Sequence, residues 1–518
     1  MAHIVIVNPR FEPSYWGYEY VLPALGVKAN TTSACLSLLA ALTPKEHRVT
    51  VIDENIEDID YDLCAKADIV ALTGMSVQRR RMKSILTTLR ESDRLIAVGG
   101  PWVTVSEDYF GNLVDVKFIG EAEQTWPQFL TEWSEGTHAA RYEQATRTDM
   151  TQVPTPDWSV LKMGNYLYGT LQISRGCPFT CEFCDIIQTF GRLPRLKTSA
   201  QVMQELDALK AAGMHSVVVV DDNLIGNKKA IKPILRDIAD WQERNGFPFR
   251  MMTEASIDLA DDPELVEMMV ATNMRYVFIG VESPNEASLR ETKKLQNVRK
   301  GRTMLEKIHD IQKRGLEITA GMIVGFDSDD SSIFQQQIEF VNKSRIINAM
   351  VGMLYAIPKT PLFHRLAREG RLDEAGEATY GTNVVPTGMK PAELLAGYNN
   401  VTAALNEVDV YFDRVDSIFL DLGMQPEIAK RKYLRNKPWA RVKSNFRWLA
   451  AGAMVATRVL SMADRKTRVA YARRIGKALV RRPLPVILAI YAGKAAIHYH
   501  TARMIDDAST GRRIQGTI

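Results

Sequence analysis

The sequence predicts an α/β protein with two successive parallel sheets and a mainly helical, basic C-terminal region. Short apolar runs alternate with helical patterns over residues 1 to about 135 and again from 170 to about 360. Runs that are apolar at nearly every position are typical of strands buried on both faces, and helices between them favour parallel pairing. The third observation is charge: residues 430–518 hold 21 Lys and Arg against three Asp, whereas the rest of the chain holds 44 basic and 58 acidic residues. This asymmetry suggests an anionic partner for the C-terminal region alone.

Length and composition are those of an ordinary soluble globular protein. The 518 residues, 46% apolar and 24% charged, are enough for two to four domains. The five cysteines, three of them clustered, leave no disulfide framework, which favours a reducing cytoplasm. The first residues, Met-Ala-His-Ile-Val-Ile-Val-Asn, lack a basic segment and a long apolar stretch, so they predict a first strand and not a signal peptide. We therefore expect a cytoplasmic location.

Glycine-containing loops follow the strands of the first alternation. Its apolar runs are Ile4–Val7, Val49–Ile52, Ile69–Leu72, Leu95–Val98 and Val116–Ile119. Ligands of parallel sheets bind at the carboxyl ends of the strands, where glycines let the backbone approach closely. The sequence has there Thr73, Gly74, Met75, Ser76 and Gln78, then Gly99, Gly100 and Pro101, and finally Gly120 and Glu121. Alone, these loops are weak evidence, because any such sheet needs glycine at its turns.

Polar residues follow the strands of the second alternation in the same way. Its six runs are 171–174, 216–220, 249–252, 276–279, 318–324 and 350–354, after a linker at 141–168 rich in Pro, Thr and Asp. The residues that come directly after them are Asp221, Asp222 and Asn223, then Glu254 and Ser256, then Glu282 and Ser283, and finally Gly321 and Gly325. Each motif alone could be strand-end capping, but four in succession favour a binding site.

Three cysteines, Cys177, Cys181 and Cys184, form a CxxxCxxC motif behind the first of these runs. Closely spaced thiolates bind iron-sulfur clusters or zinc, and both usually have four protein ligands. No further Cys or His lies nearby in the sequence, so a closed zinc site would need a distant partner, whereas a 4Fe-4S cluster with three ligands keeps one iron open. A zinc or purely structural site remains the alternative. Cys35 and Cys64 are expected to be core thiols.

With Phe183 before the last cysteine, the motif resembles the signature of the radical S-adenosylmethionine (SAM) enzymes. The resemblance implies that the open iron chelates SAM, and that an electron from the cluster splits SAM to a 5'-deoxyadenosyl radical. It further implies a partial (β/α)6 TIM-type barrel over residues 169–385 and an external electron donor of the flavodoxin or ferredoxin type. The SAM contacts it implies are Phe183, Asp221, Asp222, Asn223, Glu254, Ser256, Glu282, Ser283, Gly321 and Gly325. Arg175, Arg192, Arg195 and Lys197 either offset the charge near the cluster or form a solvated face.

Residues 1–140 resemble the Rossmann-like cobalamin-binding domain of cobalamin-dependent radical SAM enzymes. The Asp-x-His-x-x-Gly motif, which supplies an axial histidine in one type of cobalamin protein, is absent. The resemblance implies that Thr73, Gly74, Met75, Ser76 and Gln78 lie below the cobalamin ring. Gly99, Gly100, Gly120 and Glu121 would line its nucleotide tail, with Pro101 as a further contact. A similar domain without this ligand remains the alternative.

Residues 181–187 and 324–329 are similar to a branch of this family that carries a C-terminal domain of unknown function, here 386–518, and includes the hopanoid C-2 methylases. The branch implies a C-methyltransferase that acts on an unactivated carbon of a hydrophobic lipid or terpenoid, through a 5'-deoxyadenosyl radical and methylcobalamin. The alternatives are a non-methylating radical SAM oxidoreductase or cyclase with a tetrapyrrole-like substrate and, from another class, a cobalamin or redox sensor.

The basic segment from residue 430 interleaves Lys and Arg with apolar and aromatic residues, as in Phe446-Arg-Trp448 and the run 481–491. Its uncharged apolar runs reach about ten residues, fewer than the roughly 20 needed to span a bilayer. Basic helices with Trp and Phe favour peripheral contact with an anionic membrane surface. We expect no nucleic acid, because the segment is as apolar as it is basic. A solvated or oligomer-forming helical tail remains the alternative.

Overall fold

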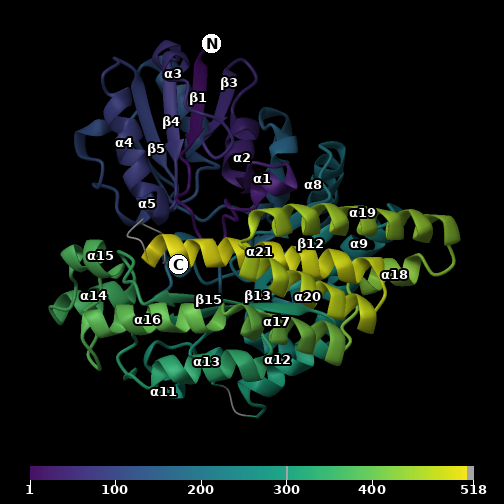
Figure 1. Cartoon of the computed structure of the whole chain (residues 1–518). Coiled ribbons are helices and arrows are strands. Elements are labelled where there is room, and N and C mark those ends of the chain that lie inside the picture. Colours follow the sequence, from purple (N-terminus) through teal and green to yellow (C-terminus); the bar gives the residue numbers. More distant parts are fainter. Residues whose placement is uncertain (299–300, 510–518) are drawn as a thin grey trace.

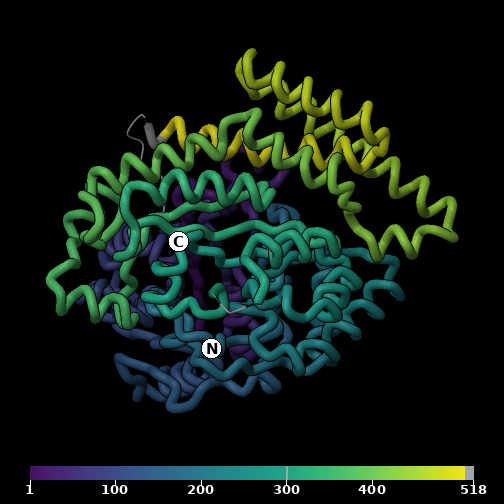
Figure 2. The backbone as a smooth tube through the Cα atoms, turned by 90° about the horizontal axis from the view of Figure 1, so that it is seen from below, coloured from purple at the N-terminus to yellow at the C-terminus, as the bar shows by residue number. Residues whose placement is uncertain are grey.

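The computed structural model describes residues 1–298 and 301–509 and has two parallel sheets, with a layer of C-terminal helices beside them (Figure 1). The predicted α/β class with a curled parallel sheet is confirmed. Seen from below, the C-terminal helices lie along one side of the barrel (Figure 2). The prediction of helix for 510–518 lies outside the described residues.

The first sheet has the order β3-β1-β4-β5-β6-β7, and all its pairs are parallel. Because β1 pairs with both β3 and β4, the strand order reverses there, and such a reversal opens a crevice at the carboxyl ends of the strands. The strands are β1 (His3–Asn8), β3 (Arg48–Asp53), β4 (Ile69–Thr73), β5 (Leu95–Gly99), β6 (Val116–Ile119) and β7 (Arg141–Glu143). The helices of this part are α1 (Leu22–Leu25), α2 (Ala34–Leu42), α3 (Tyr61–Lys66), α4 (Arg79–Leu89), α5 (Pro101–Val105) and α6 (Thr125–Glu135).

The second sheet has the order β15-β14-β13-β12-β11-β8-β2 and is also parallel. Six of its strands were predicted: β8 (Tyr166–Leu171), β11 (Ser216–Val219), β12 (Arg250–Ala255), β13 (Met274–Glu282), β14 (Glu317–Val324) and β15 (Asn348–Met353). The seventh, β2 (Ala29–Thr31), comes from the N-terminal part and pairs with β8. The chain thus passes from the first sheet to the second over residues 9–31. The sequence did not predict this, because β2 has three residues and only one apolar side chain.

Helices cover the barrel strands, and their sequences explain where they begin. In α8 (Ser199–Ala211), Thr198 and Gln201 form a reciprocal capping box. The side chain of Asn227 caps α9 (Lys228–Arg244), which buries Ile231, Leu235 and Ile238 at helical spacing. The other helices of this part are α7 (Ile186–Thr189), α10 (Pro263–Ala271), α11 (Glu286–Glu291), α12 (Met304–Lys313), α13 (Ile333–Ser344), α14 (Pro361–Arg368) and α15 (Glu374–Tyr380).

The C-terminal helices form a second core of their own. The run 481–491, predicted as part of a basic segment in contact with a membrane surface, contributes to this core instead: Ile487, Ile490 and Tyr491 are almost fully buried. A buried ion pair between Lys494 and Glu317 ties the last helix to the barrel. The helices are α16 (Pro391–Leu405), α17 (Val408–Asp416), α18 (Ile428–Tyr433), α19 (Pro438–Met462), α20 (Arg465–Arg481) and α21 (Pro485–Ser509). Within residues 1–298 and 301–509, none of the helices has the length and apolar character needed to cross a membrane.

Two glycines of these helices should respond in opposite ways to alanine. A Cβ on Gly452 of α19 would lie 2.7 Å from the backbone nitrogen of Ala489 in α21, so Gly452→Ala must push the two helices apart. A Cβ on Gly476 of α20 would meet no atom within 4 Å. We expect Gly452→Ala to lower the free energy of unfolding by about 1–3 kcal/mol. Gly476→Ala should raise it by about 0.5–1 kcal/mol, because alanine favours the helix. Denaturant titration of both variants checks this, and a stabilising Gly452→Ala would contradict the close helix contact.

Candidate functional site

The cysteine loop is closed at its base by a short antiparallel pair, β9 (Ser174–Arg175) with β10 (Arg195–Leu196). Gly176 has φ +97°, and a Cβ there would lie 2.9 Å from the carbonyl oxygen of Leu193. Its N–H donates to Asp222 Oδ2 at 2.9 Å, and the N–H of Cys177 donates to the carbonyl of Gly191 at 3.2 Å. The position before the first cysteine therefore requires glycine.

Amide groups and one lysine surround the cysteine sulfurs. Asn223 Nδ2 lies 3.8 Å from Cys177 Sγ, and Gln296 Nε2 lies 3.6 Å from Cys181 Sγ. Burial alone would lower the pKa of Lys294, but Glu282, at 2.6 Å, and Cys181 raise it. Donors and a fixed positive charge stabilise thiolates. Sequence reasoning found Asn223 and Glu282 but missed Lys294 and Gln296, which lie in a turn without any motif.

The three cysteines do not form a site for a single metal ion. In the described residues, no group of three or more His, Cys, Asp or Glu side chains is arranged to hold a single metal ion. In a cubane cluster each cysteine binds a different iron, so its ligands need not converge in this way. Burial raises the pKa of Cys177 and of Cys184, and a bound positive group would lower it again.

The carboxylates after β11 and β12 differ in their surroundings: Asp221 is hydrogen-bonded to the protein, whereas Glu254 is exposed. Both oxygens of Asp221 are used: Oδ1 accepts from the Ile173 N–H at 2.7 Å, and Oδ2 from the Ser174 N–H and hydroxyl at 2.8 and 2.6 Å. Burial raises the pKa of Asp221 to about 6 and that of Asp222 to about 7. The Glu254 side chain reaches solvent although protein surrounds it on most sides, and this burial and the charges of Asp222 and Asp221 raise its pKa to about 7. A cation bound here would relieve the repulsion among the three groups.

Phe183 and Ser256 also lie beside the cysteine loop and its carboxylates. The Phe183 ring lies 6.2 Å from the ring of Phe326 and 5.8 Å from Lys294 Nζ. The Ser256 hydroxyl accepts from Asn223 Nδ2 at 3.2 Å and donates to Asp258 at 2.5 Å. Both residues are thus linked to groups that contact the cysteines.

The remaining predicted SAM contacts serve packing in this structure. The buried Ser283 hydroxyl accepts from the Asn285 N–H at 3.1 Å. A Cβ on Gly321 would lie 2.7 Å from the Phe278 ring, and one on Gly325 would lie 2.9 Å from Leu394. Both glycines make room for protein side chains.

A cavity of about 240 Å³ lies at the carboxyl ends of β4, β5 and β6. Six predicted cobalamin contacts line it: Thr73, Gly99, Gly100, Pro101, Gly120 and Glu121. Its other walls are largely apolar side chains of α2, with Trp126 from α6 and Phe190 from the cysteine loop. The buried hydroxyl of Thr189, also in the wall, has no hydrogen-bond partner among the described residues.

The other predicted cobalamin contacts, Gly74, Met75, Ser76 and Gln78, are not part of the cavity wall. Gln78 fixes their loop, since its Oε1 accepts from the Met75 N–H at 2.9 Å and its Nε2 donates to Asn8 Oδ1 at 3.1 Å. Met75 is 49% exposed. The prediction that Cys35 is a core thiol is wrong: it lines the cavity, 3.6 Å from the Thr73 hydroxyl, whereas Cys64 is buried in the core of the first sheet.

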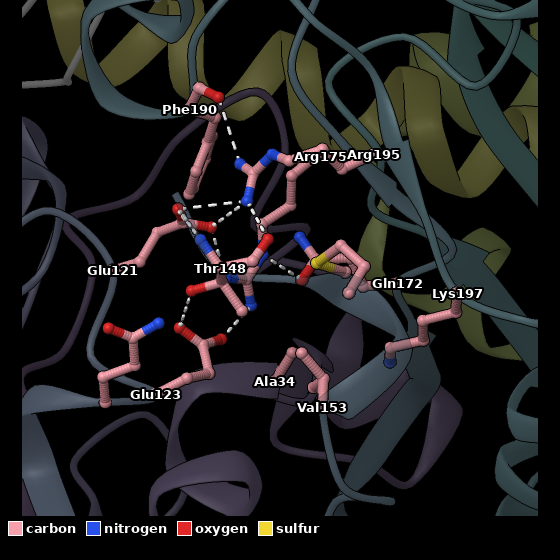
Figure 3. A network of polar contacts seen from close by, with 12 residues as sticks. Ala34, Glu121, Glu123, Thr148, Val153, Gln172, Arg175, Phe190, Arg195 and Lys197 are labelled. Carbon is pink, nitrogen blue, oxygen red and sulfur yellow. Dashed lines mark hydrogen bonds and ion pairs between the residues drawn. The ribbon is translucent and has the colours of Figure 1, made fainter. Parts of the chain in front are cut away.

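A buried ion network joins this cavity to the cysteine loop (Figure 3). Arg175 contacts Glu121 at 2.9 Å and Glu123 at 2.6 Å, and Arg195 contacts Glu121 at 3.1 Å. Thr148 N–H also donates to Glu121, at 3.0 Å. Arg175 immediately precedes Gly176 and Cys177, so the rim of the cavity and the start of the cysteine loop are held by the same side chain.

The cations near the cysteine loop are therefore mostly paired and not a solvated face. Arg175 and Lys197 are buried, and Lys197 pairs with Glu205. Arg192, in contrast, is exposed and donates to the carbonyl of Pro178 at 3.2 Å.

Glu121→Gln should weaken this network, because it leaves two arginines with less compensation inside the protein. We expect the free energy of unfolding to fall by roughly 3 kcal/mol. The matched control is Glu143→Gln, whose partner Arg141 lies at 2.7 Å at the exposed surface, and it should change stability by less than about 0.5 kcal/mol. Chemical denaturation of both variants measures the difference; equal effects would contradict the buried network.

Comparison with known proteins agrees with this geometry. Residues 171–336 match the model of the radical SAM superfamily, and residues 360–513 match a domain of unknown function (DUF4070). The chain is 38% identical to an uncharacterized methyltransferase of Synechocystis over 81% of this chain and 79% of the relative. It is 35% identical to the hopanoid C-2 methylase of Rhodopseudomonas palustris, over 71% of each.

Two solved structures share the fold. The radical SAM methyltransferase TsrM from Kitasatospora setae, with cobalamin and a [4Fe-4S] cluster bound, has a TM-score of 0.58 at 15% identity, over 71% of this chain and 75% of that chain. The cobalamin-dependent SAM radical enzyme OxsB, with aqua-cobalamin and SAM bound, has a TM-score of 0.58 at 14% identity, over 99% of this chain and 82% of that chain. On the identity to its relatives and the match over the barrel, the chain belongs to the radical SAM superfamily and is one of its methyltransferases.

Proposed function

We propose that the chain is a cobalamin-dependent C-methyltransferase acting on an unactivated carbon of a hydrophobic, hopanoid-like lipid. The observation that carries the proposal is the ion network in which Arg175 joins the cavity of the first sheet to the cysteine loop of the second. A methyl carrier in the first part and a radical source in the second must meet at one substrate. A shared, buried wall between the two binding regions provides that proximity.

The chemistry of the cysteine loop fits a 4Fe-4S cluster held by Cys177, Cys181 and Cys184. Amide donors of Asn223 and Gln296 point at two of the sulfurs, which is typical of hydrogen bonding to cluster ligands. The positive charge of Lys294 would offset the negative charge of the thiolates. With three protein ligands, one iron stays open for SAM.

The carboxylates at the barrel mouth fit the cationic end of SAM. Asp221 has both oxygens engaged in bracing residues 173 and 174, so Asp222 and Glu254 are better placed to accept from an ammonium group. Ser256 and Asn223 lie beside them, and Phe183 packs next to the last cysteine. Glu282 would act through Lys294. Contacts of SAM with Ser283, Gly321 and Gly325 remain predictions from the family.

The cavity fits the nucleotide tail of cobalamin better than the whole cofactor. Its volume of about 240 Å³ lies below the usual range for complete ligand sites, roughly 300–1,000 Å³, and its wall is mostly apolar. Gly100 has φ +96°, and a Cβ there would lie 2.7 Å from the Thr73 hydroxyl, so glycine lets the loops after β4 and β5 pack closely at the cavity wall. The loop after β4 would lie below the cobalamin ring and contains no histidine. Its residues are Thr73, Gly74, Met75, Ser76 and Gln78.

When bound, the cluster and cobalamin would supply the electron that cleaves SAM and the methyl group that is transferred. The chain itself orients SAM through Asp222 and Glu254 and fixes the cysteine loop through Gly176 and Asp221. No residue is needed as a general acid or base. An external electron donor of the flavodoxin or ferredoxin type would complete the reaction. The 35% identity to a hopanoid C-2 methylase supports a hydrophobic substrate class.

Cys181→Ala tests the proposal. After anaerobic reconstitution with iron, sulfide and cobalamin, the variant should lose SAM cleavage to 5'-deoxyadenosine by more than about 100-fold, because the cluster lacks a ligand. Cys64→Ala, which removes a buried thiol of the first sheet, should retain iron and activity. Mass spectrometry of the products shows whether a methyl group is added; dehydrogenated product without methylation would contradict methyl transfer. Absence of 5'-deoxyadenosine in the reconstituted wild type, with an intact cluster, would contradict enzymatic SAM cleavage.

A further inference from the structure

The basic C-terminal region has two kinds of cations. Four of the seven Lys and Arg of α20 pair with carboxylates of α17 and of the turn that follows it. Arg473 and Arg474 contact Asp409, at 2.5 and 2.8 Å, and Arg474 also contacts Asp413 at 2.7 Å. Lys477 contacts Asp416 at 2.7 Å, and Arg481 contacts Asp421 at 3.1 Å. The positive charge of α20 therefore helps to hold the fold.

The cations from α18 to the first half of α19 have no such partners. Residues 430–447 contain eight Lys and Arg and no Asp or Glu. Within the described parts of the chain, none of these eight groups has a carboxylate within 4.0 Å. They are Lys430, Arg431, Lys432, Arg435, Lys437, Arg441, Lys443 and Arg447. Positive charge without a carboxylate partner is thus concentrated in this segment.

The same segment exposes large apolar side chains. Trp439 is 85% exposed, Val442 58%, Phe446 69% and Leu449 47%. Their spacing of three and four residues puts them on one face of α19, which we call the α19 stripe. On the opposite face, the Trp448 ring packs against Arg250, whose guanidinium lies 5.3 Å from the centre of the ring. Gly452 on that face contacts α21, and α19 lies along α21 (Figure 1). The contacts of that face direct the α19 stripe outward.

We infer that the α19 stripe and the eight surrounding cations dock on an anionic lipid bilayer. Exposed Trp and Phe gain free energy by entering the headgroup region, while unpaired Lys and Arg are attracted to acidic headgroups. A second copy of the chain fits less well, because a twofold interface over the stripe would bring eight cations against eight. A nucleic acid would pair with the cations but leave the apolar stripe in water.

This inference deepens the proposed function, since a lipid substrate would be reached from the membrane, but its test needs no catalysis. The full-length protein is sedimented with vesicles of phosphatidylcholine alone and with vesicles that also contain phosphatidylglycerol. Binding is expected only to the anionic vesicles, and high salt should weaken it. Arg435→Gln and Arg441→Gln should each reduce the partition coefficient about fivefold.

The triple variant Trp439→Ser, Val442→Ser and Phe446→Ser should reduce binding to anionic vesicles at least tenfold. Its matched control is Val469→Ser with Val480→Ser, two valines of α20 that are 62% and 85% exposed, and this control should bind as the wild type does. Equal loss in both variants, or no binding of the wild type, would overturn the inference. So would a wild-type dimer in sedimentation velocity that only the stripe variant abolishes. SAM cleavage without lipid, assayed in the stripe variant, should stay at the wild-type level, so a failure of docking and a failure of the proposed chemistry are distinguishable.

Discussion

The arrangement of this protein depends on one buried cation. Arg175 bridges Glu121 and Glu123 at the carboxyl end of the first sheet while its own backbone begins the cysteine loop. A guanidinium withdrawn from water is tolerated only where carboxylates compensate it, so the two parts of the chain can adopt few relative positions. The cavity and the cysteines are therefore placed by the same interaction.

A second constraint acts where the barrel strands end. After β11, each of three successive residues has its own hydrogen-bond partners. Asp221 accepts from the backbone before the cysteine loop, Asp222 accepts from the Gly176 N–H, and Asn223 lies beside Cys177 and Ser256. Burial, together with neighbouring carboxylates, raises the pKa of Asp222 and that of Glu254 to about 7. Such a site is prepared for a cation.

The parallel strands and the cysteine motif could be read from the sequence because both have local patterns. Apolar runs mark buried strands, and CxxxCxxC is compact. What could not be read depends on contacts between distant residues. β2 has three residues and is defined only by its pairing with β8. Lys294 and Gln296 reach the cysteines from a turn more than a hundred positions away. The run 481–491 looks like an exposed tail until Tyr411, Phe412 and Tyr471 are seen to cover it.

In the proposed reaction, the cavity and the cysteine loop work as one site for methyl transfer to a lipid. The most direct measurement is an anaerobic incubation of the reconstituted protein with a lipid extract and SAM carrying a trideuterated methyl group, with and without cobalamin. We expect a lipid that gains one trideuterated methyl group. It should form together with 5'-deoxyadenosine and only when cobalamin is present. Formation of 5'-deoxyadenosine without labelled lipid, or labelled lipid without cobalamin, would contradict it.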